Sequence, residues 1–319
     1  MLASLKFVQG AVAAKDFVPE LCHFRIENGT IRGYNGMLGL CSPIDLDLDV
    51  SPKAVPFIKA VQTCKNETVQ LHMTPGGKLS VKSGKFKALI DCLPENDFPD
   101  TMPKGLETGL NGDMLGVLKA LAPFIAEDAS KPWARGILFK GQSAYATNNI
   151  CLVEHWLTSP FPVEVNIPRS AVLELIRIGE EPEKLQISED RVTFHYSGNR
   201  WLSTQTYSNQ WPDLSRILDV ESNQKEIPEG LWEAVESLTP FVDDLGRIYF
   251  HNGSAATSLA EGEGASVEVP DLPAEGGCFH FKQLSLLAKN VKTIDFSSYP
   301  RPCLFYGDNL RGAIIGFKG

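Results

Sequence analysis

The chain has 319 residues, enough for two or three domains, and its 43% hydrophobic content allows sizeable buried cores, which excludes an intrinsically disordered protein. No stretch of about 18 consecutive apolar residues is present, so a membrane-spanning helix is not expected. The formal net charge of −9 argues against a simple basic nucleic-acid binder, and seven cysteines without a C-x-x-C spacing predict reduced thiols in a cytoplasmic protein.

The first third of the chain reads as helix, strands, helix, strands. Apolar residues at helical spacing between residues 2 and 12 predict an opening helix, and Asn28-Gly29 predicts a tight hairpin between two short strands. Ser51 is the predicted N-cap of a second helix, with Pro52 at its first position. Three further strands complete this third.

The same order of elements is predicted twice more. In the second third, helices are expected at residues 111–125 and 170–179, with short strands between and after them. In the last third, helices are expected at residues 227–238 and 279–290, again followed by strands. Each third is thus expected to be α+β, with two helices packed on antiparallel sheets.

A recurring stretch indicates that one domain is used several times. SGKFKALIDCLPENDFPD, residues 83–100, has a counterpart in SGNRWLSTQTYSNQWPDL, residues 197–214. The Ser-Gly pairs are separated by 197 − 83 = 114 positions and the prolines by 212 − 99 = 113, so the period is nearly constant. Gly307 follows Gly198 by 109 positions in a fainter third copy. We therefore expect domains at residues 1–107, 108–218 and 219–319.

The charge is unevenly divided among these three parts. Their basic and acidic residues give 12 − 12 = 0, 10 − 12 = −2 and 8 − 15 = −7, which sum to −9. The acidity therefore lies mainly in the last third. A protein of net negative charge can still bind DNA if its basic groups line one surface.

No catalytic arrangement is indicated by the sequence. A complete P-loop, a G-x-S-x-G elbow, an H-E-x-x-H pair and a dinucleotide-binding glycine pattern are all missing from the chain. The six histidines are dispersed and are interpreted as strand or surface residues, with a shared metal site as the weaker alternative. No spacing points to paired catalytic carboxylates, although the sequence leaves that alternative open. We expect no enzymatic activity, no cofactor and no metal.

The two copies of the recurring stretch resemble the ends of the first and second domains of the bacterial DNA polymerase III beta subunit, the sliding clamp. The resemblance covers almost the whole chain and is strongest in the middle. It implies three DNA-clamp domains per subunit and a head-to-tail homodimer that closes into a ring. In such a ring the helices line the hole and the strands form a continuous outer sheet. The implied function is a polymerase processivity factor that encircles duplex DNA without reading its sequence.

On this resemblance, a set of basic residues is expected to face DNA. Lys59 and Arg177 are the leading candidates because they occupy matching positions in the second helices of their repeats. The other candidates are Lys6, Lys15, Lys65, Lys119, Arg169, Lys282 and Lys289. Each has a solvated surface charge as its alternative role. The first helix of the third repeat departs from the pattern, because it carries Glu229, Glu233 and Glu236 and no basic residue.

The resemblance also implies a pocket for a short hydrophobic partner peptide, between the second and third domains. The matching positions are Ala134, Thr147, Asn149, Ile150, Cys151, Leu152, Leu218, Ala313, Ile315 and Phe317. The family often has Gly-His-Arg where this chain has Asn149-Ile150-Cys151, so partner specificity is expected to differ. Apolar residues at these positions have a plain core role as their alternative.

The implied partners are duplex DNA, a DNA polymerase, an ATP-driven clamp loader and a second copy of the chain. Two departures from the family, the short length and the apparent lack of a strand before the first helix, suit a divergent version encoded by a virus of bacteria. The alternative function is a repeat-built structural or interaction scaffold, such as a virion component, that binds no DNA.

Overall fold

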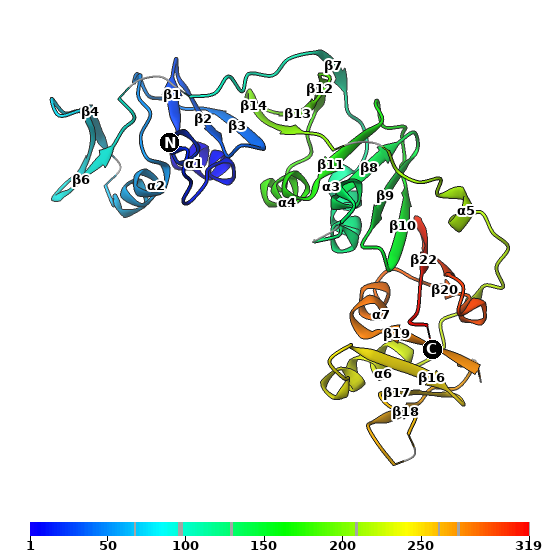
Figure 1. Cartoon of the computed structure of the whole chain (residues 1–319). Coiled ribbons are helices and arrows are strands. Elements are labelled where there is room, and N and C mark those ends of the chain that lie inside the picture. The colour runs from blue at the N-terminus through cyan, green and yellow to red at the C-terminus, as the bar shows by residue number, and fades with distance from the viewer. Residues whose placement is uncertain are drawn as a thin grey trace. The chain divides into compact units, whose positions relative to one another are not determined.

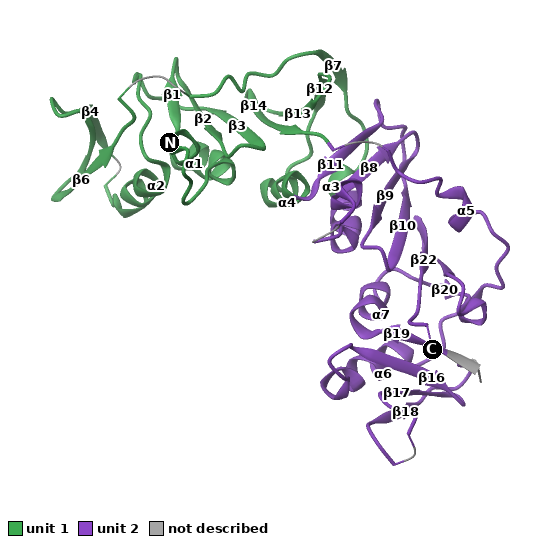
Figure 2. Cartoon of the chain, viewed as in Figure 1, with its two compact units in different colours: residues 1–115, 170–206 green, residues 116–169, 207–319 purple. Residues whose placement is uncertain are grey.

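The protein structure is a computed structural model that describes residues 1–66, 68–94, 98–127, 130–207, 210–260, 262–272 and 275–318 (Figure 1). The chain divides into two compact units, residues 1–115 with 170–206 and residues 116–169 with 207–319 (Figure 2). All three breaks between the units fall inside the second predicted domain, so the division into three domains stays a prediction. Residues 95–97 of the recurring stretch lie outside the described residues.

The described strands of the first unit form two antiparallel sheets. The larger has the order β1-β2-β3-β14-β13-β12-β7 and the smaller the order β4-β5-β6. The strands are β1 (Arg25–Glu27), β2 (Thr30–Tyr34), β3 (Leu38–Pro43), β4 (Gln70–Met73), β5 (Lys78–Ser83), β6 (Phe86–Asp91), β7 (Leu106–Gly109), β12 (Lys184–Ile187), β13 (Arg191–Tyr196) and β14 (Arg200–Gln205).

The larger sheet joins the first two repeats edge to edge. Strand β3, from the first repeat, pairs antiparallel with β14 from the second, with Leu40 opposite Leu202. The hairpin predicted at Asn28-Gly29 is confirmed: both residues have positive φ, which places the tight turn between β1 and β2.

The helices of the first unit bury one face each. They are α1 (Leu2–Val8), α2 (Ala54–Thr63) and α4 (Arg169–Ile178), whose first residue belongs to the other unit, with 3-10 turns at Gln9–Ala11 and Pro19–Cys22. Leu5, Val8 and Phe57 are completely buried. Helices α1 and α2 contact each other, and α1 also packs on β2 and β3. The apolar spacing at the N-terminus therefore predicts the opening helix correctly.

The predicted N-cap at Ser51 is wrong. Helix α2 begins at Ala54 with Lys53 as its N-cap, and no side chain caps it. The backbone before it is extended, because the Ser51 carbonyl accepts a hydrogen bond from the Leu93 amide at 3.0 Å and Pro52 bridges to Cys92. Sheet-like pairing thus uses the residues that the capping pattern assigned to the helix start.

The second unit also has two antiparallel sheets among its described residues. One has the order β11-β8-β9-β10-β22-β21-β20-β15 and the other the order β18-β17-β16-β19. The strands are β8 (Gly136–Lys140), β9 (Ser143–Thr147), β10 (Cys151–Trp156), β11 (Val165–Pro168), β15 (Lys225–Glu226), β16 (Arg247–His251), β17 (Ser254–Ala256), β18 (Ser266–Glu268), β19 (Glu275–His280), β20 (Thr293–Ile294), β21 (Cys303–Tyr306) and β22 (Leu310–Ile314).

The helices of the second unit are α3 (Met114–Leu121), whose first two residues belong to the other unit, α5 (Ser215–Leu218), α6 (Leu231–Leu238) and α7 (Phe281–Leu287). Short 3-10 turns lie at Ala122–Phe124, Pro132–Arg135, Thr239–Phe241 and Phe296–Ser298. Helices α6 and α7 lie side by side (Figure 1). Their buried leucines, such as Leu231 and Leu284, face the core of the unit.

The repeat is visible in matching turns and pairings. Asn35 and Asn148, 113 positions apart, each accept hydrogen bonds through the side-chain oxygen from the amides two and three residues later. The sheets β4-β5-β6, β12-β13-β14 and β20-β21-β22 occupy equivalent places in the three repeats. The predicted α+β class, with helices packed on antiparallel sheets, is confirmed. None of the helices in the described ranges is long and apolar enough to cross a membrane.

Candidate functional site

A cavity of about 580 Å³ opens in the second unit, where the second and third repeats join. One wall is the turn from β9 to β10, another is the end of β22, and the third is the connecting segment from residue 210 to residue 217. The lining residues are Lys131, Trp133, Thr147, Asn149, Ile150, Cys151, Leu152, Gln210, Trp211, Pro212, Leu214, Ile217, Pro302, Ala313 and Ile315. We call this cavity the apolar pocket.

Seven of the ten residues expected at a peptide pocket line this cavity together: Thr147, Asn149, Ile150, Cys151, Leu152, Ala313 and Ile315. Leu218 lies beneath it in a buried cluster with Leu152, Leu304 and Ala313. The other two lie outside the lining. Ala134 is fully buried, and its carbonyl accepts a hydrogen bond from the Ala126 amide. Phe317 donates its amide to the Cys278 carbonyl at 2.7 Å and stacks near His280.

The tryptophans of the apolar pocket were not among the expected residues. Trp133 and Trp211 lie with ring centroids 4.9 Å apart, and the Lys131 ammonium is 5.7 Å from the Trp133 ring. The Trp211 indole nitrogen is buried without a hydrogen-bond partner among the described residues. Trp211 lies in the recurring stretch, and this position could have identified it from the sequence. Trp133 follows residues that carry no repeat signal.

Local hydrogen bonds shape the β9–β10 turn. Asn149 has a φ of 70°, a conformation that asparagine tolerates better than most residues. The Asn148 side chain caps the turn through its oxygen and donates its amide nitrogen to Gln283 of α7 at 2.7 Å. The Asn148 side chain therefore ties the turn to α7, since its oxygen binds the turn and its nitrogen binds the helix. This places Ile150 at the rim of the apolar pocket.

An ion pair holds together the sheet beneath this pocket. Glu154 on β10 lies directly opposite Arg311 on β22, and the Arg311 Nε donates to the Glu154 carboxylate at 2.6 Å. Arg311 also contacts Asp219 at 2.8 Å, beside Leu218. Burial alone would raise the pKa of Glu154, but hydrogen bonds from Ser143, Arg311 and Tyr145 outweigh it and hold the pKa below its usual value.

The chemistry of the apolar pocket suits binding. Cys151 is completely buried, and burial raises the pKa of its thiol far above the usual value, so the sulfur stays protonated and behaves as an apolar group. Aromatic and aliphatic side chains supply most of the lining. Such a cavity buries apolar side chains of a ligand and fixes them with few polar contacts. In the described ranges, groups of three or more histidine, cysteine or acidic residues placed to hold a metal ion are absent.

The residues expected to face DNA fall into two classes. Lys6, Lys15, Lys59, Lys65, Lys119, Lys282 and Lys289 are exposed, on helices or in the loops that follow them. Lys59 lies within α2, two residues after the buried Phe57, whereas Lys289 lies in the turn that follows α7, two residues after its last residue, Leu287.

Arg169 and Arg177 form the second class, because both are ion-paired within the chain. Arg169 contacts Glu127 at 2.9 Å. Arg177 contacts the buried Glu174 at 2.5 Å and donates to the carbonyls of Lys6 and Phe7 at the end of α1. The Arg177 guanidinium is thus compensated in charge and holds two helices together, and its contact with DNA stays a prediction.

Helix α6 keeps its acidic character in the structure. Glu233 and Glu236 are exposed, and the buried residues of the helix are Leu231, Ala234, Val235 and Leu238. The first helix of the third repeat therefore presents carboxylates to solvent where the corresponding helices α1 and α3 present Lys6 and Lys119.

The fold of this chain matches that of solved sliding clamps. The chain is similar to the DNA polymerase III subunit beta from Bartonella birtlesii, solved bound to griselimycin, with a TM-score of 0.85 and 18% identity over 100% of this chain and 97% of that one. It is equally similar to the beta sliding clamp of C. crescentus (TM-score 0.86, 16% identity, the same shares) and to the clamp of Bacillus subtilis (TM-score 0.83, 16% identity).

Curated relatives point the same way. Over 243 residues the chain is 23% identical to the beta sliding clamp of Salmonella typhimurium, a match that covers 68% of this chain and 65% of the relative. The clamp of Pseudomonas putida matches at 23% over 241 residues, with the same shares. The match thus spans less than two thirds of these relatives. No family model matches the chain. The resemblance to the bacterial beta sliding clamps that the sequence indicates is confirmed, as a divergent one; an origin in a virus stays a prediction.

Proposed function

We propose that the chain is a DNA sliding clamp, a non-enzymatic processivity factor that encircles duplex DNA and tethers a polymerase. The observation that carries this proposal is the edge-to-edge joining of repeats within a sliding-clamp fold. Exposed lysines on the helices and directly after them, such as Lys59 and Lys289, supply cations for phosphate contacts that carry no sequence information. An acidic protein is compatible with this function because only the DNA-facing helices need positive charge.

Ring closure follows from the pattern of strand pairing. Strand β3 pairs with β14, and the equivalent strand β10 pairs with β22. The next members of this series are β18, the third repeat's equivalent of β3 and β10, and β6, the first repeat's equivalent of β14 and β22. Both lie at the edge of their sheets among the described strands. Pairing of β18 with β6 of a second copy continues the series and closes two chains head to tail.

The two edges have complementary charges. Lys82 on β5 lies directly opposite Lys87 on β6, and like charges in that relation are destabilising unless a partner compensates them. The edge around β18 carries exposed Glu263, Glu268 and Asp271. Residues 252–281 contain no lysine or arginine. The segment that contains β18 is therefore net negative, opposite in sign to the lysines of the proposed partner edge.

The apolar pocket is the proposed site for a partner peptide, supplied by the polymerase and by an ATP-driven loader. Trp211, Ile315 and Leu152 offer apolar surface to a short hydrophobic segment. Asn149 stands at the rim of the pocket, where the neutral turn is expected to select a different peptide from a rim that carries histidine and arginine.

The decisive experiment measures topological linkage. The protein, loaded by a bacterial clamp loader and ATP onto a nicked circular plasmid, is passed through a sizing column before and after the plasmid is linearised. A clamp stays with the circle and is lost from the linear form, because it slides off the ends. Equal retention on both forms would indicate ordinary binding, and no retention on either would favour the scaffold function. Lys59→Glu with Lys289→Glu is expected to reduce retention while the protein keeps its oligomeric state.

A further inference from the structure

The first unit contains a second cavity, of about 340 Å³. It lies where the first and second repeats join, between the connecting segment at residues 100–104 and the strands β13 and β14. Its lining residues are Asp100, Thr101, Met102, Lys104, Ser188, Glu189, Asp190, Arg191, Thr193 and Ser203. We call it the polar pocket.

The polar pocket is the repeat-equivalent of the apolar pocket. The offset of 113 that relates Pro99 to Pro212 also relates Thr101 to Leu214 and Lys104 to Ile217, which line the respective cavities. Strand register gives a third pair: Ser203 lies opposite Gly39 and Ala313 lies opposite Leu152, and Gly39 and Leu152 are again 113 apart. One scaffold therefore builds a pocket at both junctions and lines it with apolar residues at one and polar residues at the other.

The floor of the polar pocket has hydrogen-bonding capacity that the described residues leave unused. Thr101 is 4% exposed, and its hydroxyl has no hydrogen-bond partner among them. The same holds for the buried Arg191 Nη2, whereas Arg191 Nε donates to Ser203 at 3.2 Å. The same guanidinium makes a cation–π contact with Tyr34, in which the Arg191 Cζ lies 5.9 Å from the ring centroid. A buried guanidinium nitrogen is costly unless an acceptor meets it.

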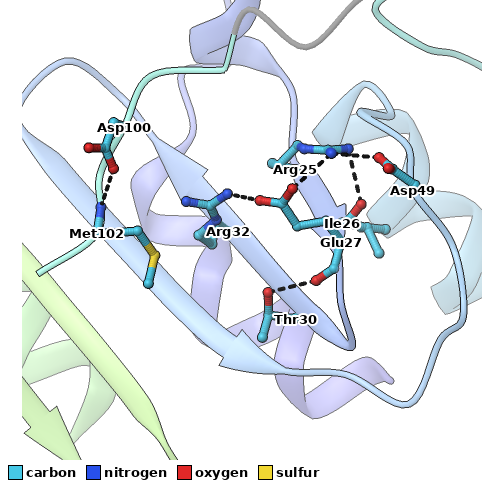
Figure 3. A network of polar contacts seen from close by, with 8 residues as sticks. All are labelled: Arg25, Ile26, Glu27, Thr30, Arg32, Asp49, Asp100 and Met102. Atoms are coloured by element: carbon cyan, nitrogen blue, oxygen red, sulfur yellow. Dashed lines mark hydrogen bonds and ion pairs between the residues drawn. The ribbon is translucent and has the colours of Figure 1, made fainter.

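Asp100 makes two short-range contacts within the wall formed by the connecting segment. Asp100 accepts a hydrogen bond from the Met102 amide at 3.1 Å (Figure 3) and an ion pair from Lys104 at 2.8 Å. Figure 3 also shows Arg32, on the neighbouring strand β2, paired with Glu27. Because Asp100 and Lys104 compensate each other, the uncompensated charges of the lining are Arg191 at the floor and the exposed Glu189 and Asp190 at the rim.

We infer that the polar pocket is a second peptide-binding site, which takes a carboxylate side chain at its floor and an adjacent basic side chain at its rim. The carboxylate oxygens would accept from Arg191, Thr101 and Ser203, a charge-assisted arrangement that a neutral group does not match. The basic group would lie against Glu189 and Asp190. A lone phosphate fits less well, because the acidic rim repels a second negative charge.

The test uses a defined probe, N-acetyl-glutamyl-lysinamide, titrated into the full-length protein and followed by NMR. The expected result is a saturable shift of the Thr101, Met102 and Ser203 amides and of the Arg191 side chain. The glutaminyl analogue is expected to bind at least about tenfold more weakly, because it loses the charge on the acceptor. Inorganic phosphate is expected to cause no saturable shift over the same range.

Two variants and a control assign the effect to the floor. Arg191→Gln and, separately, Thr101→Val are each expected to weaken probe binding, by about tenfold for the arginine. Arg135→Gln, at an exposed arginine of the other unit, is the matched control and is expected to leave binding unchanged. Thr101→Val keeps the side-chain shape, so it stays informative if Arg191→Gln unfolds the protein. Absence of shifts, shifts that survive both substitutions, or equal binding of phosphate would each overturn the inference.

Discussion

Arg311 and Glu154 face each other across the junction between the second and third repeats, 2.6 Å apart. They come from strands that are 157 positions apart in the chain, and they lie beneath the apolar pocket. Ser143 and Tyr145 donate to the same carboxylate, at 2.6 Å and 2.9 Å. The junction is thus held by backbone pairing and by one buried carboxylate with three donors.

Removing the arginine is expected to destabilise this junction. Arg311→Leu leaves Glu154 buried without its cation, and loss of one partner of such a pair costs about 3 kcal/mol. Thermal or urea unfolding measures the loss. Arg135→Leu, at an exposed arginine of the same unit, is the matched control and is expected to change stability by less than about 0.5 kcal/mol. Equal stability of the two variants would contradict the structural role of the pair.

The contribution of Glu154 is expected to depend on pH. Its pKa is lower in the folded protein than in the unfolded chain, so its stabilisation is fully present above the unfolded value, about 4.3 for glutamate, and is lost as the pH falls through the folded value. The difference in unfolding free energy between the wild type and Arg311→Leu should therefore shrink in acid. A difference that stays constant from neutral pH to strongly acidic pH would contradict this assignment.

Arg177 is expected to behave as a structural residue. Arg177→Gln leaves the buried Glu174 without its cation and the Lys6 and Phe7 carbonyls without their donor, which should cost about 2–3 kcal/mol. Lys59→Gln is the matched control, because its side chain is exposed and the loss of a surface charge changes stability by less than about 0.5 kcal/mol. Urea unfolding checks both, and a stable Arg177→Gln variant would return this arginine to the DNA-facing set.

Most of the correct predictions from the sequence came from local patterns and from the repeat. Asn28-Gly29 encodes its own turn, and the spacing of apolar residues places the opening helix, because both depend on neighbours in the chain. The predicted N-cap at Ser51 was wrong because the backbone of this residue pairs with Leu93, and a local capping pattern contains no information about such a distant partner. The pairing of Arg177 with the end of α1 joins residues 170 positions apart, and its charge alone gives no sign of it.

The candidate pockets show the same limit. Seven lining residues of the apolar pocket follow from the resemblance, whereas Trp133 enters it only through the packing of a 3-10 turn against the connecting segment. The polar pocket had no sequence signal of its own. Thr101 and Lys104 became significant only when the structure showed that they line a cavity, as the residues at the equivalent repeat positions, Leu214 and Ile217, also do.

Peptide binding at the apolar pocket is expected to require Ile315, which lines the cavity and is 41% exposed. Ile315→Asp places a charge where an apolar side chain would be buried, and affinity for a fluorescent hydrophobic pentapeptide should fall by at least about tenfold, measured by anisotropy. Leu106→Asp, at a leucine that is 83% exposed in the other unit, is the control for the added charge. Both variants should unfold at the wild-type temperature, and unchanged affinity of Ile315→Asp would place the peptide elsewhere.

Head-to-tail assembly is expected to depend on charge at the two free sheet edges, β6 with the neighbouring Lys82 of β5 on one side and β18 on the other. Lys82→Glu with Lys87→Glu sets acidic side chains against the acidic edge around β18, so light scattering should show a mass near the 35.0 kDa monomer where the wild type is dimeric. Glu268→Lys in the same chain should restore part of the dimer, because opposite charges then face each other again. Raising the salt concentration should weaken the wild-type dimer and narrow the gap between variants, since exposed charges are screened. If the double variant remains dimeric, or if Glu268→Lys does not restore the dimer, the interface is not formed by these two edges and another surface joins the copies.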